Sequence, residues 1–247
     1  MFEILTKPDF VFYKDVPPWL GENYQMFFTA ALFYCYIVHN YQGVFNYSLK
    51  FPLFLWNMLL CIYSIASTYV LLPVVITKIY HRGYLESVCL FDKKNSYMVQ
   101  PYGWWIFLFA LSKIVELGDT AFLILRGKKV PFIHWYHHVV TLVWGYAQCI
   151  KVMYPAEWAV TMNTFIHSWM YAYYAISVYY PMKGNKILSI LQISQMIHGI
   201  IITILFNMYA DISYIDYIPI VIYAIYAHLF INMYKNKYQA IRNHHRD

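Results

Sequence analysis

The residues best suited to chemistry lie between positions 113 and 138. The segment begins with Lys113, Glu116 and Asp119, which stand three residues apart in an otherwise apolar run. At the centre of a membrane-spanning helix, each such charge costs about 2.5–3.5 kcal/mol on insertion scales. The spacing predicts that they share one helical face with Thr120, where they could form an ion-pair network or serve a reaction.

Three histidines follow within five residues, namely His134, His137 and His138. If this stretch is helical, the three rings crowd one face. A lone histidine on an apolar face is usually a satisfied packing residue. Three together, close to a charged segment, instead favour a reactive cluster.

The composition identifies the chain as a polytopic membrane protein. Of its 247 residues, 61% are hydrophobic and only 12% are charged, which is far below the charged fraction of about 25% in soluble domains. Aromatic residues make up 21% of the chain, so many must line helix contacts or an internal cavity. The net charge of +6 is spread over loops, which argues against a nucleic-acid partner.

Apolar runs long enough for spanning helices predict seven transmembrane segments in an all-α fold. They cover residues 24–44, 52–76, 102–125, 131–150, 155–180, 186–209 and 213–234. Residues 80–101 mix apolar and charged side chains and could lie along the membrane interface or re-enter the bilayer. No repeat or linker is found, so residues 1–247 are expected to form one domain.

Loop charges predict the orientation of the chain. With the C-terminus in the cytosol, that side carries ten Lys and Arg residues and the other side carries seven. The polar segments then converge on the cytosolic half. The glycosylation sequon at Asn46 also falls in the cytosol and is expected to be unmodified. Cys89 and Cys149 fall near the opposite face, and whether they pair is left open.

Two further rows of polar side chains follow helical spacing. They are Asn163, His167, Tyr171 and Tyr174, and then Ser189, Gln192, Gln195 and His198. Hydrogen bonds between helices, worth about 0.6 kcal/mol per pair, could explain either row alone. Combined with the histidine cluster, the rows predict one polar chamber.

In their order along the chain, these motifs resemble those of the ELO family of fatty acid elongases. The resemblance rests on Lys113-x-x-Glu116-x-x-Asp119-Thr120, His134-x-x-His137-His138, Asn163-x-x-x-His167-x-x-Met170-Tyr171-x-Tyr173-Tyr174 and Ser189-x-x-Gln192-x-x-Gln195. It covers residues 113–195 densely and the rest by hydropathy only. Ser189 stands where the family usually has Thr, which preserves the hydroxyl.

The resemblance implies a 3-oxoacyl-CoA synthase of the endoplasmic reticulum membrane. Such an enzyme joins a long-chain acyl-CoA to malonyl-CoA and releases carbon dioxide and CoA, with no cofactor. Six of the seven spans would form a barrel around a substrate tunnel. Expected partners are the lipid bilayer and the reductases and dehydratase that complete elongation, and a homo-oligomer is left open.

A Claisen condensation requires an activated acyl group and stabilised oxyanions. No cysteine lies in the predicted chamber, and a neutral imidazole can serve as the nucleophile instead. The resemblance assigns attack on the acyl thioester to His137. His134 and His138 would polarise carbonyl groups or shuttle protons, and His167 would position or protonate the malonyl unit.

The remaining site residues are expected to support these histidines and to bind substrate. Glu116 and Asp119 would fix the imidazole tautomers, with Lys113 balancing their charge. The candidates for contact with substrate inside the chamber are Asn163, Met170, Tyr171, Tyr174, Gln192 and Gln195. The candidates for the CoA phosphates are Arg126, Lys128, Lys129, Lys183, Lys186 and Lys235. The acyl tail would run towards the far face, where bulky aromatic residues would limit its length.

Two alternatives stay open at this point. A membrane di-iron desaturase or hydroxylase also uses the HxxHH pattern, but it needs further histidine boxes, and only His167 and more weakly His198 extend this one. No metal is therefore expected. A seven-helix transporter or receptor could use the same acidic and histidine residues as a proton relay or ligand site.

Overall fold

The computed structural model describes residues 4, 7, 10–89, 102–151, 156–182, 184–209 and 214–243. The predicted all-α class is confirmed, because these residues form helices and no β-strand occurs among them. The helices are α2 (Phe12–Glu22), α3 (Tyr24–Asn40), α4 (Lys50–Cys89), α5 (Tyr102–Val115), α6 (Gly118–Leu125), α7 (Phe132–Lys151), α8 (Ala156–Tyr179), α9 (Lys186–Tyr209) and α10 (Ile218–Asn243). A 3₁₀ turn, η1 (Tyr214–Tyr217), precedes α10.

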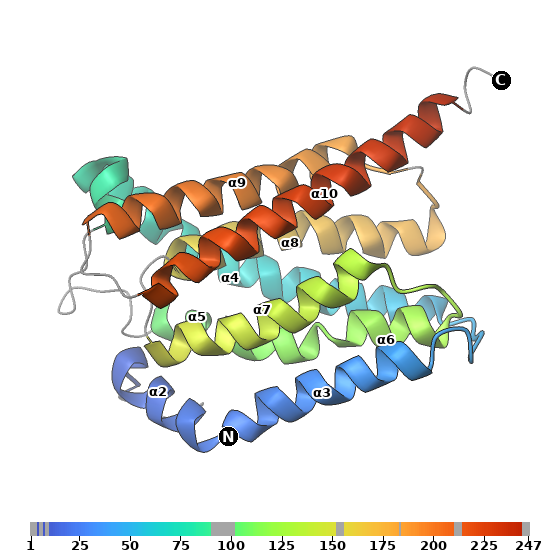
Figure 1. Ribbon diagram of the computed structural model, residues 1–247, viewed down its shortest axis with the longest axis horizontal. Helices are drawn as coiled ribbons and strands as arrows, with labels where there is room; N and C mark the ends of the chain where they lie inside the picture. The colour runs from blue at the N-terminus through green and yellow to red at the C-terminus, as the bar shows by residue number, and fades with distance from the viewer. Residues whose placement is uncertain are drawn as a thin grey trace.

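The long helices lie side by side along the longest axis of the molecule (Figure 1). Helix α4 packs against α8, α8 against α9, and α9 against α10. Helix α10 also contacts α7, α7 contacts α5, and α5 contacts α4. Helix α3 packs against α7. The polar motifs of α5–α6, α7, α8 and α9 are thereby brought towards one another.

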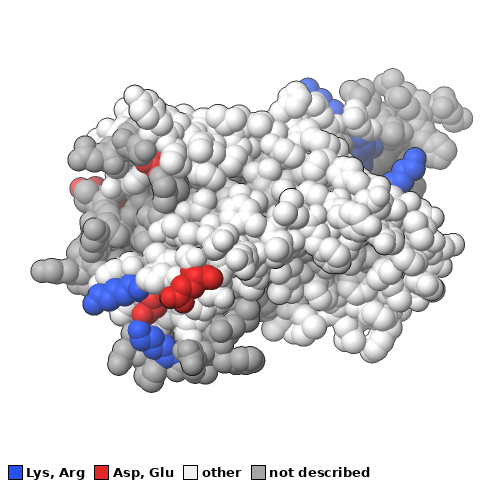
Figure 2. Space-filling view, turned by 60° about the horizontal axis from the view of Figure 1, so that its bottom comes forward, with Lys and Arg blue, Asp and Glu red and all other residues white. Residues whose placement is uncertain are grey.

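Among the residues that the structure describes, three helical segments are long and apolar enough to cross a membrane, namely α4, α9 and residues Tyr214–Tyr238. Large apolar side chains such as Leu32 and Tyr69 are exposed on the outside of the bundle, where lipid would cover them. On the face drawn in Figure 2, the Lys, Arg, Asp and Glu side chains lie towards the two ends, with an uncharged band between them. These features identify a multi-pass membrane protein.

Several helices differ in extent from the predicted spans. Helix α4 runs to Cys89, and its part before Gly83 is about 50 Å long, which exceeds a hydrocarbon core of about 30 Å. It therefore includes the first part of the predicted interfacial segment and turns at Gly83, where φ is 76°. Residues 90–101 lie outside the described residues. Helix α3 ends at Asn40, and α10 begins at Ile218 and continues past the predicted end.

The predicted span 102–125 is not one helix. It is interrupted at Glu116 and Leu117, between α5 and α6. The backbone N–H of Leu117 donates to the carbonyl of Ile114 at 3.3 Å, and that of Asp119 donates to Glu116 at 3.1 Å. These three-residue bonds tighten the turn, so the side chains that follow are rotated relative to α5.

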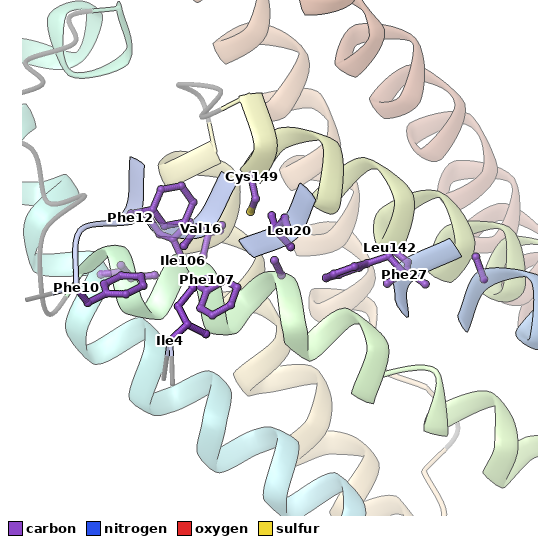
Figure 3. Close-up of a cluster of buried hydrophobic side chains, with 14 residues drawn as sticks. Ile4, Phe10, Phe12, Val16, Leu20, Phe27, Ile106, Phe107, Leu142 and Cys149 are labelled. Atoms are coloured by element: carbon purple, nitrogen blue, oxygen red, sulfur yellow. The ribbon is translucent and has the colours of Figure 1, made fainter. Parts of the chain in front are cut away.

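Helix α2 lies at one end of the bundle (Figure 1), and its buried side chains belong to the apolar cluster drawn in Figure 3. Phe12, Val16 and Leu20 lie four residues apart on one face and are fully buried. They join Phe107 of α5 and Leu142 of α7 in one apolar cluster. All four cysteines of the chain are free, so Cys89 and Cys149 form no disulfide.

Candidate active site

The histidine cluster lies in the first two turns of α7. The His134 and His138 ring centroids are 4.5 Å apart, and those of His137 and His138 are 5.8 Å apart. The i, i+3, i+4 spacing therefore brings the three rings together. His138 is buried, as is His167 of α8.

A cavity of about 240 Å³ lies beside this cluster. Its wall is built from the α5–α6 junction and from α7, α8, α9 and α10. The predicted site residues that line it are Glu116, Asp119, His134, His137, His138, Asn163, His167, Met170, Tyr171, Tyr174, Gln192 and Gln195. Side chains from well-separated parts of the sequence thus meet around one space.

Lys113 anchors a hydrogen-bond network between α5 and α8. Its ammonium donates to Glu116 Oε1 and Oε2 at 2.8 and 3.0 Å and to Asn163 Oδ1 at 3.1 Å. Because that oxygen faces an ammonium, the Asn163 Nδ2–H group points to His167 Nε2, 3.2 Å away. His167 Nδ1 lies 3.9 Å from Glu116 Oε2. His167 is thus held by a chain of polar groups that starts at Lys113.

Asp119, like Lys113, contacts α8, and it also contacts α4. Its carboxylate accepts hydrogen bonds from Trp56 Nε1 of α4 at 2.7 Å and from the Tyr171 hydroxyl of α8 at 2.9 Å. The close approach of Trp56 depends on Gly118, since a Cβ there would lie 2.4 Å from the indole ring. Asp119 is thereby tied to an indole and a phenol.

Thr120 contacts the histidine cluster. Its hydroxyl lies 2.8 Å from His134 Nε2 and 2.8 Å from the Tyr34 hydroxyl of α3. The prediction of one shared face therefore holds for Lys113, Glu116 and Asp119, which all contact α8, and is wrong for Thr120. The turn at Glu116 directs Asp119 towards α4 and α8, and Thr120 towards α3 and α7.

The His137 ring is held by packing. It lies 4.8 Å from the Tyr226 ring and 6.4 Å from the Phe230 ring, both on α10. Its backbone carbonyl accepts hydrogen bonds from Thr141 at 2.7 Å and Tyr226 at 3.3 Å. The buried Nδ1 has no hydrogen-bond partner among the described residues. A ring with so few polar contacts keeps its lone pair available for reaction.

Two smaller cavities continue from the first. One of about 70 Å³ shares His137, Asn163 and Gln195 with it, and it is also lined by Lys113. A third, of about 10 Å³, shares Tyr223 with the second and reaches Asp216. The row runs along the bundle from the histidines towards the beginning of α10, and its cavities become smaller in that direction.

Comparison with known proteins assigns the chain to a family. The sequence profile of the ELO family, described as the GNS1/SUR4 family, matches residues 19–246. The chain belongs to the ELO family.

ELO relatives with established names match most of the chain. Very long chain fatty acid elongase 6 of Drosophila melanogaster is 34% identical over 81% of this chain and 64% of its own length. Very long chain fatty acid elongase 3 of Mus musculus is 34% identical over 82% of this chain and 76% of its own. Fatty acid elongase 1 of Trypanosoma cruzi is 39% identical over 61% of this chain and 53% of its own length. The chain thus spans somewhat less than two thirds of the Drosophila relative.

Two residues of the predicted polar row on α9 lie away from the 240 Å³ cavity. Ser189 donates to the Asn185 carbonyl at 3.2 Å, and His198 Nε2 lies 2.8 Å from the Tyr84 hydroxyl. A three-residue step falls about 60° short of a full turn, so a row with this spacing winds around the helix. Gln192 and Gln195 line the chamber, while the prediction that the ends of the row also line it is wrong.

The basic residues expected at the ELO substrate opening lie outside the cavity wall. Lys128, Lys129, Lys186 and Lys235 are exposed, Arg126 is half-buried, and none of them is among the lining residues of the 240 Å³ cavity. Pro131 and Met233 of that wall are close in sequence to Lys129 and Lys235. Lys183 lies outside the described residues.

The sequence patterns missed several residues that line the candidate site or contact its side chains. They are Tyr34, Trp56, Gly118, Tyr226 and Phe230. Trp56 carried the clearest signal, because an indole N–H inside an apolar run needs a partner. A tyrosine carried little signal in a chain with 27 of them.

Proposed function

We propose that this ELO-family protein is a condensing enzyme of fatty acid elongation, a 3-oxoacyl-CoA synthase acting on acyl-CoA and malonyl-CoA. The observation that carries the proposal is the place of His137, whose ring lines both the polar chamber and the narrower cavity beyond it. An acyl group on this ring could extend into the narrower cavity while its carbonyl faces the polar groups. The elongase names of the relatives support the same reaction.

In the proposed first step, a His137 ring nitrogen attacks the carbonyl carbon of the acyl thioester. A C–N bond forms, the C–S bond breaks, and the imidazole proton leaves with the CoA thiol. Malonyl-CoA then loses carbon dioxide, and the resulting enolate carbon attacks the acyl-imidazole. A C–C bond forms, the C–N bond breaks, and one proton is taken up as His137 is restored.

The other polar groups have proposed roles in these steps. His134 and His138 face the developing oxyanions, and His167 positions or protonates the malonyl unit. The chain of Lys113, Asn163 and His167 supports this, because it holds the His167 ring in one orientation. Amide and hydroxyl groups of α8 and α9 would orient the thioesters, and basic residues near Pro131 and Met233 would meet the CoA phosphates.

We further infer that six helices form a barrel around the cavities and that seven spans cross the endoplasmic reticulum membrane, with the C-terminus in the cytosol. The successive pairing of α4, α8, α9, α10, α7 and α5 supports the barrel, with α3 packed outside on α7. The excess of basic residues on the side of the C-terminus supports the orientation.

Mass spectrometry tests the nucleophile directly. Protein incubated with acyl-CoA alone should carry an acyl adduct on His137 and release CoA, whereas His137→Ala should do neither. His198→Ala serves as the matched control, since this histidine lies outside the cavity. An adduct on another residue, or substantial turnover by His137→Ala, would overturn the assignment. Stoichiometric iron in the purified protein would instead favour a desaturase.

A further inference from the structure

A hydrogen-bonded chain connects the outer helix α3 to the histidine cluster. The Tyr34 hydroxyl lies 2.8 Å from Thr120 Oγ1, which lies 2.8 Å from His134 Nε2. Tyr34 and Thr120 are both buried. Among the described residues, these contacts are the only hydrogen bonds of the two hydroxyl groups and of the His134 ring.

The direction of this chain follows from counting donors. Each hydroxyl has one hydrogen to donate, and each can accept. If Tyr34 donates to Thr120 and Thr120 donates to His134 Nε2, both hydrogens are used. If His134 Nε2 donates instead, either the Tyr34 hydrogen or the Thr120 hydrogen is left without an acceptor among the described residues. An unused buried donor is costly, so the first direction is favoured.

The favoured direction fixes the tautomer of His134. A ring nitrogen that accepts a hydrogen bond carries no proton, so the proton of the neutral ring lies on Nδ1. The described residues give Nδ1 no hydrogen-bond partner, and the ring lines the 240 Å³ cavity. His134 thus presents an unused N–H donor to whatever occupies the site.

We propose that Tyr34 and Thr120 are positioning residues that hold His134 as its Nδ1–H tautomer, so that His134 donates a hydrogen bond to the substrate carbonyl oxygen as it becomes negative. The inference rests on the proposed function and selects one role for His134, because a ring in this tautomer cannot use Nδ1 as a base. The neighbouring His138 ring, 4.5 Å away, places this donor within the histidine cluster.

Nitrogen-15 magnetic resonance of histidine-labelled protein in lipid tests the tautomer without substrate. The two ring nitrogens of a neutral imidazole differ strongly in chemical shift according to which one carries the proton. Comparison with His134→Gln assigns the signals. We expect His134 to be protonated on Nδ1 in the wild type and to lose this preference in Thr120→Val. Protonation of His134 on Nε2 in the wild type would overturn the proposal.

Turnover supplies the second test. Thr120→Val should lower kcat for condensation roughly tenfold with little change in the acyl-CoA KM, because an oxyanion donor acts mainly in the transition state. Thr120→Ser should restore kcat to the wild-type value. The kcat of Tyr34→Phe should lie between the values of Thr120→Val and the wild type. Equal kcat in Thr120→Val and the wild type, or a Thr120→Ser protein as slow as Thr120→Val, would contradict the relay.

Matched substitutions separate this effect from damage to the fold. Thr161→Val removes another buried, hydrogen-bonded threonine hydroxyl, and Tyr36→Phe removes an exposed phenol from the same helix as Tyr34. Both should retain the wild-type kcat. If the wild-type protein releases no CoA from a mixture of acyl-CoA and malonyl-CoA, the proposed function fails. The tautomer measurement still decides whether Tyr34 and Thr120 hold His134 as proposed.

Discussion

At the scale of the residue, the buried charge of Lys113 requires compensation. Lys113 and Glu116 are each 4% exposed, and the lysine ammonium contacts both carboxylate oxygens. Ser112 adds a hydrogen bond to Glu116 Oε1 at 3.0 Å. The pair therefore resembles other buried salt bridges, in which the loss of one partner leaves an unpaired charge.

We predict that Lys113→Met destabilises the protein more than the double substitution Lys113→Met/Glu116→Gln. The single change leaves Glu116 buried without its cation, at a cost of about 3–5 kcal/mol, whereas the double change removes both charges. Thermal unfolding in detergent measures the difference. A double variant that unfolds at or below the temperature of the single variant would contradict this account. Both variants should be inactive, because the chain to His167 begins at Lys113.

At the scale of the element, the beginning of α6 is shaped by the fit of an indole against a glycine. Replacing a glycine by alanine inside a helix usually stabilises the folded protein by about 0.5–1 kcal/mol. Here the new methyl group would overlap the Trp56 ring and displace the group that donates to Asp119. Local helix preference and site geometry therefore oppose each other at Gly118.

We predict that Gly118→Ala lowers the condensation rate about tenfold or more, because Asp119 loses its indole partner and the site shifts. Trp56→Phe should also slow the reaction. The double variant Gly118→Ala/Trp56→Phe should be no slower than Trp56→Phe alone, since the hydrogen bond from residue 56 to Asp119 is already absent there. Gly21→Ala in α2, where no atom lies within 4 Å of the new Cβ, is the control and should be fully active. Additive losses in the double variant would contradict the coupling.

The contact between α9 and α10 sets where the row of cavities narrows. A Cβ on Gly199 would lie 2.7 Å from the Tyr223 ring, so the phenol fills the space opposite this glycine. Both residues line the smallest cavity, and Tyr223 also lines the one before it. This ring is therefore one of the side chains that separate the two smaller cavities and limit how far the space extends from His137.

We predict opposite effects for the two substitutions at this contact. Tyr223→Ala should shift the products towards longer acyl chains, because it joins the two smaller cavities. Gly199→Ala should shift them towards shorter chains, because it pushes the ring into the passage. Product lengths measured by mass spectrometry over a series of acyl-CoA substrates decide the matter. Tyr214→Ala, at a side chain 95% exposed, should change nothing. Shifts in the same direction would refute this explanation.

At the scale of the whole molecule, the loops 41–49 and 126–131 meet at the end that carries the C-terminal part of α10 (Figure 1). The Tyr47 backbone N–H donates to the Leu125 carbonyl at 2.8 Å, and Val130 donates to Gln42 at 3.0 Å. The proposed orientation places this end in the cytosol, together with the sequon at Asn46.

We predict that Asn46 carries no glycan when the protein is made in cells. Treatment with an endoglycosidase should leave its electrophoretic mobility unchanged, and Asn46→Gln should migrate like the wild type. A sequon in a tag placed ahead of Met1 should be glycosylated, which controls for access to the enzyme. A glycan on Asn46 would reverse the orientation and move the proposed CoA-binding end to the lumen.

The sequence predicted the helical class and most helix positions, because apolar runs report directly on burial in lipid. It also predicted which motif residues meet, since His134, His137 and His138 need only regular helical spacing. It could not predict the turn at Glu116, because the regular spacing of Lys113, Glu116 and Thr120 suggested a continuous helix. The partners of Asp119 and Thr120 depend on tertiary packing, which no local pattern contains.

The ring of Tyr223 has one more consequence under the proposed reaction. Each round of condensation adds two carbons, so the product of one round returns as a longer substrate for the next. A chain that just reaches the phenol is accepted, and its successor has no room. The series of lipids would then end abruptly at one size and would not fade gradually, and the enzyme would need no separate signal to stop.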